Sequence, residues 1–254
     1  MSLLTHCGGR VVDVQELESI ELPQTTRTYQ PLPYTDFIDM VKEAGNKSLA
    51  GYDLTNESYA VSKDNKKMFG VLTYKYTYRD LKEEIFSIKD RPDEDFQLSV
   101  GIRSSLDKSI RPEICGGAKV FVCDNLLFTG DIMAFRKQTK FIYRDIMDEI
   151  EKMLGRCILN FITLKRQKDF LKSNKIDQDN GYRQLGYLAG LGVLSPTQFT
   201  SAMKEWKDPV YSEFIERNQW SFYNACTEAL KSTNPRKIME RHIQLHNVMQ
   251  PAMA

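Results

Sequence analysis

The sequence predicts an α+β fold, in which an antiparallel β-sheet of hairpins in the N-terminal half packs against a long helix and a helical C-terminal part follows. Apolar residues follow a strand pattern from about residue 54 to residue 139, whereas from residue 141 onward they recur at helical spacing. Strands that precede the helices, instead of alternating with them, are typical of this class. We expect a sheet domain with the long helix over residues 1–175 and a helical region over residues 176–254, packed together as one unit.

The first expected element is a short helix that follows an irregular opening with Thr and Pro residues. Residues 33–45 place Thr35 at the N-cap, acidic residues in the first turn and Gly45 at the C-terminal end. This order predicts a helix that stops at Gly45.

Two strand patterns follow the helix. Residues 57–76 predict a hairpin with a polar turn at residues 63–66, and residues 96–105 alternate between apolar and polar side chains. This alternation predicts a half-buried antiparallel strand. The acidic segment between them, residues 80–95, is expected to be a solvated connection. The apolar face of the alternating strand carries Leu98, Val100 and Ile102, and its polar face carries Gln97, Ser99 and Arg103.

The segment GGAKVFVCDNLLFTGD, residues 116–131, permits three interpretations. Both alternating faces are apolar over residues 118–128, which predicts an interior strand with Cys123 in the core and a turn or bulge at the Asp-Asn pair after it. A phosphate-binding loop of the Walker type is disfavoured because the Gly and Lys residues stand in the wrong order. A catalytic thiol requires a base, and none of the three histidines lies near Cys123 in the sequence, although proximity in space stays open.

The second half of the chain predicts several helices. An apolar stripe marks one continuous helix over about residues 141–172. Ser195 and Gln198, with a Pro between them, form a capping-box signature at the start of a later helix. Residues 211–232 and residues 234–249 predict two more helices, the last opened by an Asn-Pro pair.

Composition limits the classes of function. A net charge of +1 and a pI of about 7.6 provide no overall electrostatic case for nucleic-acid binding, so a polyanion site has to be local. Five scattered cysteines without CxxC spacing indicate reduced thiols, as in the cytoplasm of a host cell. The longest uncharged run, residues 184–203, is too polar for a membrane span, so we expect no membrane segment.

No catalytic constellation is recognisable, and we expect neither a cofactor nor a metal ion. His242 and His246 lie four residues apart on an expected helix, but a zincin would have Glu where Ile243 stands. These histidines are expected on a helix surface or in packing contacts. Gly186 and Gly190 have GxxxG spacing and are expected to serve helix packing. An enzyme is therefore the least favoured class.

A basic cluster at the transition from the last strand to the long helix is the strongest candidate for a binding surface. If the cations on the strands point to the same open face, Phe135, Phe141 and Tyr143 flank a surface able to follow a sugar-phosphate backbone. The alternative is an ordinary solvated edge, where charges prevent edge pairing. The candidate cations are Arg103, Lys108, Lys119, Arg136, Lys137, Lys140 and Arg144.

Several segments, in order along almost the whole chain, carry a family resemblance. They are PLPYTDFIDMV, YAVSKDNKKMFGVL, LSVGIRSSLDKSI, GAKVFVCDNLLFTG with RKQT after it, and WSFYNACTEALK. Together they resemble the phage- and plasmid-borne family known as domain of unknown function 932. The resemblance implies a mobile-element origin but no established reaction. Family members have a turn of the type Asn-Ser-His/Tyr-Asp-Lys-Ser, of which residues 104–109 keep only Asp-Lys-Ser, so a role that needs the missing groups does not carry over.

Two hypotheses of different classes follow. The first is a nucleic-acid-binding module that uses the candidate cations and binds or anneals single strands, alone or as a homo-oligomer. In outline, the order of strands and long helix is similar to phage single-strand annealing recombinases, which is an association and not a proof. The second is a noncatalytic protein that binds and modulates a host protein through aromatic residues of the C-terminal helices. These are Trp206, Tyr211, Phe214, Trp220, Phe222 and Tyr223.

Overall fold

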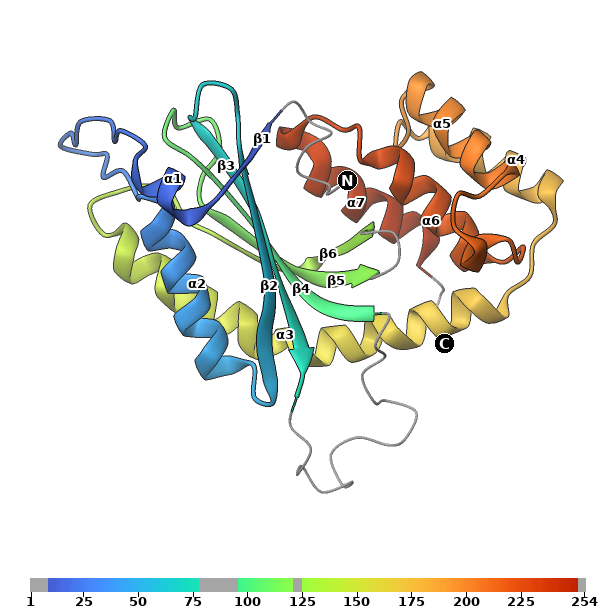
Figure 1. Cartoon of the computed structure of the whole chain (residues 1–254), viewed down its shortest axis with the longest axis horizontal. Coiled ribbons are helices and arrows are strands. Elements are labelled where there is room, and N and C mark those ends of the chain that lie inside the picture. The colour runs from blue at the N-terminus through green and yellow to red at the C-terminus, as the bar shows by residue number, and fades with distance from the viewer. Residues whose placement is uncertain (1–8, 78–95, 121–124, 251–254) are drawn as a thin grey trace.

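The computed structural model describes residues 9–77, 96–120 and 125–250. Within these residues the chain forms a six-stranded antiparallel sheet in its N-terminal half and helices after it, so the predicted α+β class is confirmed. The long helix α3 (Ile142–Ser173) runs along one side of the curved sheet, and the last helices lie on its other side (Figure 1). α3 is the long helix that the apolar stripe predicts.

The sheet is a meander in which each strand pairs with the next one along the chain. The predicted hairpin between the second and third strands is confirmed, and Asn65 in its turn has a left-handed backbone with φ 57°. Asn adopts this conformation more readily than most residues, which explains the position of the turn. The strands are β1 (Arg10–Val12), β2 (Tyr52–Val61), β3 (Lys67–Tyr76), β4 (Phe96–Ser105), β5 (Glu113–Val120) and β6 (Asn125–Phe135).

The prediction of a single interior strand over residues 118–128 is wrong. β5 ends at Val120 and β6 begins at Asn125, and these two residues are opposite each other in the sheet. The apolar pattern continues from one strand into the next, so periodicity could not mark the reversal. Cys123 and the Asp beside it lie outside the described residues, and so does the acidic connection of residues 80–95.

One face of the sheet packs against α2 (Tyr34–Ser48) and α3 in the main hydrophobic core. The expected limits of α2 are wrong, because Pro33 and not Thr35 occupies the N-cap position and the helix continues past Gly45. A Cβ atom at Gly45 would lie 2.6 Å from the hydroxyl oxygen of Tyr74 on β3. This glycine therefore permits close packing of the helix on the sheet and does not end the helix.

The other face of the sheet is covered by α7 (Pro235–Met249), which opens at the predicted Asn-Pro pair. Val71 and Cys115 of the sheet pack there against Ile238 and Met239 of α7. The polar face of β4 is consequently buried too, since Ser99 is 0% exposed and Arg103 is 6% exposed. The prediction of a half-buried β4 is wrong because a helix more than a hundred residues later in the chain covers its second face.

The remaining helices lie at the β6 side of the sheet, between α3 on one face and α7 on the other (Figure 1). They are α4 (Gln178–Gly190), α5 (Pro196–Lys207) and α6 (Gln219–Leu230). The capping box of Ser195 and Gln198 at the start of α5 is confirmed. Residues 211–232 form a 3-10 turn, Ser212–Phe214, before α6, and not one helix, because Asn218 caps a new helix start.

Two short elements lie in the opening that was expected to be irregular, namely β1 and α1 (Val14–Glu18).

In the described part of the chain, no helix combines the length and apolar character needed to cross a membrane. The main core contains residues of the sheet, of α3 and of α4 to α6, so the C-terminal helices share one core with the sheet.

Two glycines of α4 provide a test of this packing. Gly181→Ala is expected to destabilise the protein by about 1–3 kcal/mol, because the new Cβ would lie 2.2 Å from Nε1 of Trp206, which is 1% exposed. Gly186→Ala in the same helix meets nothing within 4 Å and is expected to stabilise by about 0.5–1 kcal/mol through helix propensity. Urea unfolding of both variants measures the difference, and equal effects would contradict the packing of α4 on Trp206.

Candidate functional site

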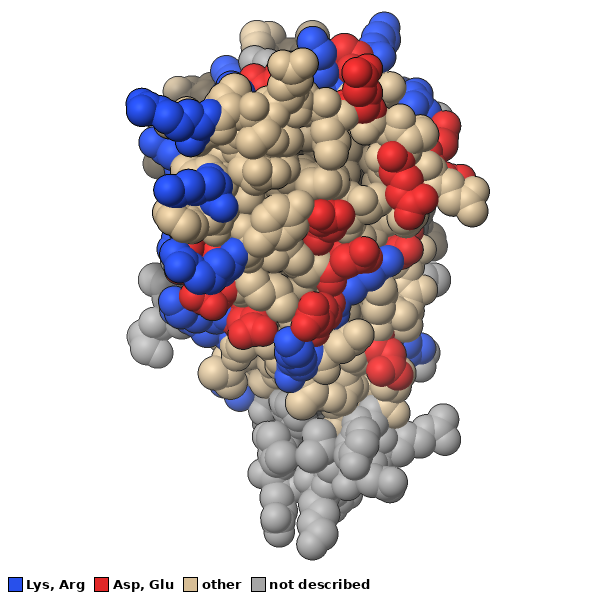
Figure 2. All heavy atoms as spheres, turned by 90° about the vertical axis from the view of Figure 1, so that its left-hand side faces the viewer, with Lys and Arg blue, Asp and Glu red and all other residues tan. Residues whose placement is uncertain are grey.

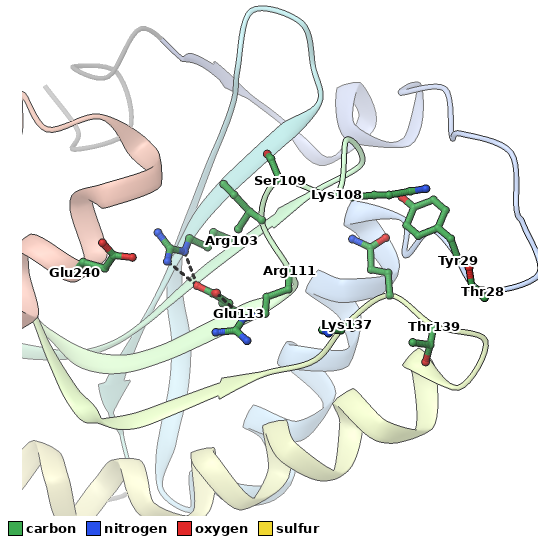
Figure 3. Close-up of a pocket in the computed structure, with 12 residues that line it drawn as sticks. Thr28, Tyr29, Arg103, Lys108, Ser109, Arg111, Glu113, Lys137, Thr139 and Glu240 are labelled. Carbon is green, nitrogen blue, oxygen red and sulfur yellow. Dashed lines mark hydrogen bonds and ion pairs between the residues drawn. The ribbon is translucent and has the colours of Figure 1, made fainter.

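A cavity of about 600 Å³ lies at one end of the sheet, between the β4–β5 loop, residues 28–29 and the β6–α3 junction (Figure 3). α7 contributes Glu240 to its lining. This size is typical of pockets that hold small molecules or single residues of a polymer. Its charged lining residues are Arg103, Lys108, Arg111, Lys137, Glu113 and Glu240.

The floor of the cavity is a carboxylate held between two guanidinium groups. Arg103 on β4 is directly opposite Glu113 on β5, and its Nε and Nη2 atoms both donate to Oε2 of Glu113 at 2.6 Å. Nε of Arg111 donates to the other oxygen, Oε1, at 3.1 Å (Figure 3). The Arg103 and Glu113 side chains are 7% and 9% exposed, whereas that of Arg111 is 45% exposed. Arg111 is therefore the guanidinium of this group that faces solvent.

The β4–β5 loop forms the rim and is fixed by an ion pair. Asp107 accepts hydrogen bonds from Nζ of Lys67 at 2.7 Å and from the backbone N–H of Ser109 at 2.9 Å. Burial by itself would raise the pKa of Asp107, but the hydrogen bonds from Lys67 and Ser109 outweigh it and hold the pKa well below its usual value. The next residue, Lys108, has φ 65° and places its Nζ 4.2 Å from the ring centroid of Tyr29.

Gln138 connects the β6–α3 junction to this rim. Its Nε2 donates to the backbone oxygen of Ser105 at 2.8 Å, and its Oε1 accepts from the N–H of Leu32 at 3.1 Å. The Gln138 side chain is buried, so these bonds are shielded from water. They hold the neighbouring Lys137 and Thr139 where both line the cavity.

The junction also carries exposed aromatic side chains. Phe135, Phe141 and Tyr143 are 38%, 49% and 40% exposed. The guanidinium carbon of Arg111 lies 3.5 Å from the ring centroid of Phe135. Burial and then a hydrogen bond to Asp36 raise the pKa of Tyr143 to about 12, so its hydroxyl stays protonated as a donor.

Two cationic side chains lie over the ring of Phe141. Nζ of Lys140 lies 4.8 Å from the ring centroid and the guanidinium carbon of Arg144 lies 5.1 Å from it. Such cation–π contacts at exposed sites contribute about 0.5–1 kcal/mol each. The contacts are weak enough for a ligand to replace them.

The structure places the seven candidate cations in three groups. Arg103, Lys108 and Lys137 line the cavity, but Arg103 is neutralised by Glu113 and does not face solvent. Lys119 is opposite Gln97, six residues along β5 from Glu113 and therefore about 20 Å from the cavity. Its side chain lies outside the described part of the structure. The expectation that strand cations share one open face is thus wrong for Arg103, because α7 covers that face.

The third group lies at the start of α3. Nη2 of Arg136 binds Glu149 at 2.5 Å, and Nη2 of Arg144 binds Asp145 at 3.0 Å, while Lys140 is exposed. On the end of the molecule seen in Figure 2, many Lys and Arg side chains line one edge and others lie at the top and near the bottom, while Asp and Glu side chains lie in the centre and toward the opposite side. This end is therefore mixed in charge and is not a continuous cationic face.

Sequence reasoning missed Arg111, Glu113, Glu240 and Tyr29. Arg103 and Glu113 stand ten residues apart on either side of a turn, at the ends of two strands, so a cross-strand ion pair could have been expected from their register. Glu240 carries no such local signal, since it comes from a helix that is distant in sequence.

The aromatic set proposed as a partner surface belongs to the core. Trp206, Phe214, Trp220, Phe222 and Tyr223 are at most 5% exposed, and Tyr211 is half-buried. The prediction that they form a surface for a host protein is wrong, because α6 is enclosed by its neighbours and its apolar side chains face inward.

The other candidate groups are buried as well. His242 and His246 are 0% and 4% exposed and face inward from α7, and the ring of His246 lies 6.3 Å from that of Tyr223. Burial raises the pKa of the Cys157 thiol to about 12, which disfavours the thiolate. Within the described ranges, no group of three or more His, Cys, Asp and Glu side chains is placed to hold a metal ion.

Gly186 and Gly190, expected to permit close helix contact, lie on an exposed face of α4. A Cβ atom added at either position would meet no other atom within 4 Å. Their GxxxG spacing therefore serves no contact between the described residues, and the packing expectation is wrong.

Comparison with protein-family models, with curated protein sequences and with solved structures finds no match to this chain. The resemblance to the family known as domain of unknown function 932 therefore stays a prediction.

Proposed function

We propose that the protein binds single-stranded nucleic acid at the β6–α3 junction. The observation that carries the proposal is the placement of two exposed rings, Phe135 and Phe141, on either side of the junction residues that line the cationic cavity. Each ring has a cation over it, Arg111 in one case and Lys140 with Arg144 in the other. A stacking platform next to cations is the arrangement that holds single strands without reading their sequence.

The two parts of the arrangement have separate roles in this proposal. Unpaired bases stack on Phe135 and Phe141, for which base–aromatic stacking contributes about 1–3 kcal/mol per base. In this proposal, phosphates bind Arg111, Lys137, Lys140 and Arg144. Arg111 is added to the sequence-based set, and Arg103, Lys108, Lys119 and Arg136 are left out of it. A duplex keeps its bases stacked inside the helix, so it cannot use the rings and is expected to bind more weakly.

Salt dependence tests the proposal directly. Four phosphate contacts on a single strand predict that log Kd changes with log salt concentration with a slope of about 3. Fluorescence anisotropy of a labelled oligothymidylate, titrated at several salt concentrations, measures this slope. The double variant Lys140→Gln/Arg144→Gln is expected to reduce the slope to about 1.5 and to weaken binding about tenfold or more.

A matched control removes the same charge elsewhere. Lys204 and Lys207 are exposed on α5, away from the junction, so Lys204→Gln/Lys207→Gln is expected to leave slope and affinity unchanged. If both double variants lost the same affinity, strand binding would depend on net charge alone and not on the junction. Absence of any binding to DNA or RNA single strands at low salt would refute the proposal.

We also propose a cytoplasmic location in a host cell. Among the described cysteines, Cys157 and Cys226 are free thiols, which supports a reducing compartment. Origin from a mobile element and assembly into a homo-oligomer remain parts of the same proposal, and both depend on the family resemblance and its outline analogy.

A further inference from the structure

We propose that the cavity is a site for a phosphate monoester, so that the protein binds the phosphorylated end of a strand in preference to an internal phosphodiester. This inference depends on the proposed function, since it names which part of the nucleic acid enters the cavity. Three features of the cavity support it: its net charge, the free donors of Arg111 and its closed floor.

The charge of the lining matches a dianion. Among the described residues, the lining has four cationic and two carboxylate side chains, which leaves an excess of two positive charges. A phosphate monoester carries about −1.5 to −2 charges at neutral pH, whereas a phosphodiester carries a single negative charge. The excess is therefore balanced by a monoester and only half balanced by a diester.

Arg111 supplies a preorganised donor pair. Its Nε is bound to Glu113, and its Nη atoms make no hydrogen bond to any described residue. Glu113 and the ring of Phe135 fix the guanidinium plane from two sides. A fixed guanidinium can donate two parallel hydrogen bonds to two phosphate oxygens. The third oxygen of a monoester remains for Lys137 or for the hydroxyls of Thr139 and Ser109, which also line the cavity.

The shape of the cavity favours a chain end. Arg103 and Glu113 close its floor, and both side chains are less than 10% exposed. α7 closes one wall, where Glu240 points toward Arg103 (Figure 3). An internal phosphate has nucleotides on both sides and needs two exits, whereas a terminal phosphate needs only one. In this proposal, the rest of the strand leaves the cavity along the junction toward Phe141.

Glu240 provides a test that does not depend on loss of function. Its carboxylate is exposed and is the one lining carboxylate not engaged by a cation among the described residues. Glu240→Gln is expected to tighten binding of an end-phosphorylated strand by about threefold to tenfold, because it removes a repulsive charge from the wall. Glu213→Gln, at an exposed site in the 3-10 turn, is the matched control and is expected to have no effect.

The experiment measures Kd for three ten-nucleotide single strands of the same sequence, with a 5′-phosphate, a 3′-phosphate or hydroxyls at both ends. One of the phosphorylated strands is expected to bind about tenfold or more tightly than the hydroxyl strand. Arg111→Lys keeps the charge but loses the planar fork, so it is expected to abolish this preference. Thermal unfolding of each variant checks that the fold is kept.

The outcomes separate the inference from the proposed function. Equal Kd values for all three strands, with strand binding intact, would overturn the inference and leave the proposed function standing. If no strand binds, but the wild type binds adenosine monophosphate and Arg111→Lys loses that binding, the proposed function is refuted and the monoester site is supported. An unchanged affinity in Glu240→Gln for the phosphorylated strand would overturn the assignment of the phosphate to this cavity.

Discussion

Replacement of Glu113 by alanine is expected to lower the free energy of unfolding by about 3–5 kcal/mol, the usual cost of removing one partner of a buried ion pair. Both bonds from Arg103 to Glu113 end on the same carboxylate oxygen, and neither side chain is more than 9% exposed. Without Glu113, the Arg103 guanidinium keeps its charge in a site that water hardly reaches. Urea denaturation of the wild type and Glu113→Ala measures the loss.

The double variant Arg103→Met/Glu113→Leu is the informative companion. Replacing a whole buried pair by apolar residues of similar size is often neutral or stabilising, so it is expected to recover most of the stability lost in Glu113→Ala. Arg111→Ala removes a guanidinium that is 45% exposed and is expected to cost less than about 1 kcal/mol. A cost below 1 kcal/mol for Glu113→Ala as well would contradict the buried character of the Arg103–Glu113 pair.

The class of fold and most helices could be predicted because their signals are local. The apolar stripe of α3 repeats over thirty-two residues, and the capping box at Ser195 lies within four residues. The Asp-Asn pair indicated a turn or bulge near the start of β6, but the apolar pattern, which is continuous through Val120 and into β6, did not show that the chain forms two strands there. Hydrophobic periodicity indicates which residues are buried but does not mark where a buried chain turns.

The burial of the polar β4 face has a different cause. Ser99 and Arg103 look like solvent-facing residues in the sequence, and one of them is charged. Arg103 tolerates burial because Glu113 on the next strand neutralises it, and α7 then covers the pair. Both partners are non-local, so polarity along one strand predicts the wrong environment.

About half of the candidate site was accessible from sequence. Lys108, Lys137 and the rings of Phe135 and Phe141 were predicted, because charges and aromatic residues cluster visibly at the junction. The remainder depends on how the fold joins four distant segments, of which α7 is the last. Glu240 acquires its place only when α7 packs on the sheet, which no pattern within the helix itself indicates.

Trp206→Ala is expected to destabilise the protein by about 3–5 kcal/mol, the usual cost of removing a buried aromatic side chain. The indole is 1% exposed, packs edge-on against Phe222 and donates from Nε1 to the backbone oxygen of Gln178 at 3.3 Å. Val210→Ala, at a neighbouring position that is 77% exposed, is expected to change stability by less than about 0.5 kcal/mol. Thermal unfolding of the two variants distinguishes a core role for Trp206 from an anchor for a partner, since an anchor could be removed without loss of stability.

Coupling between Trp206 and Gly181 strengthens this test. Because the Cβ of Gly181→Ala would overlap the indole, Trp206→Phe creates the space that the new methyl group needs. The double variant Gly181→Ala/Trp206→Phe is therefore expected to be more stable than the sum of the two single changes predicts, by about 0.5–3 kcal/mol. If the changes in the free energy of unfolding were strictly additive, the two side chains would not be in contact. That result would contradict the contact between α4 and α5 that encloses the aromatic core.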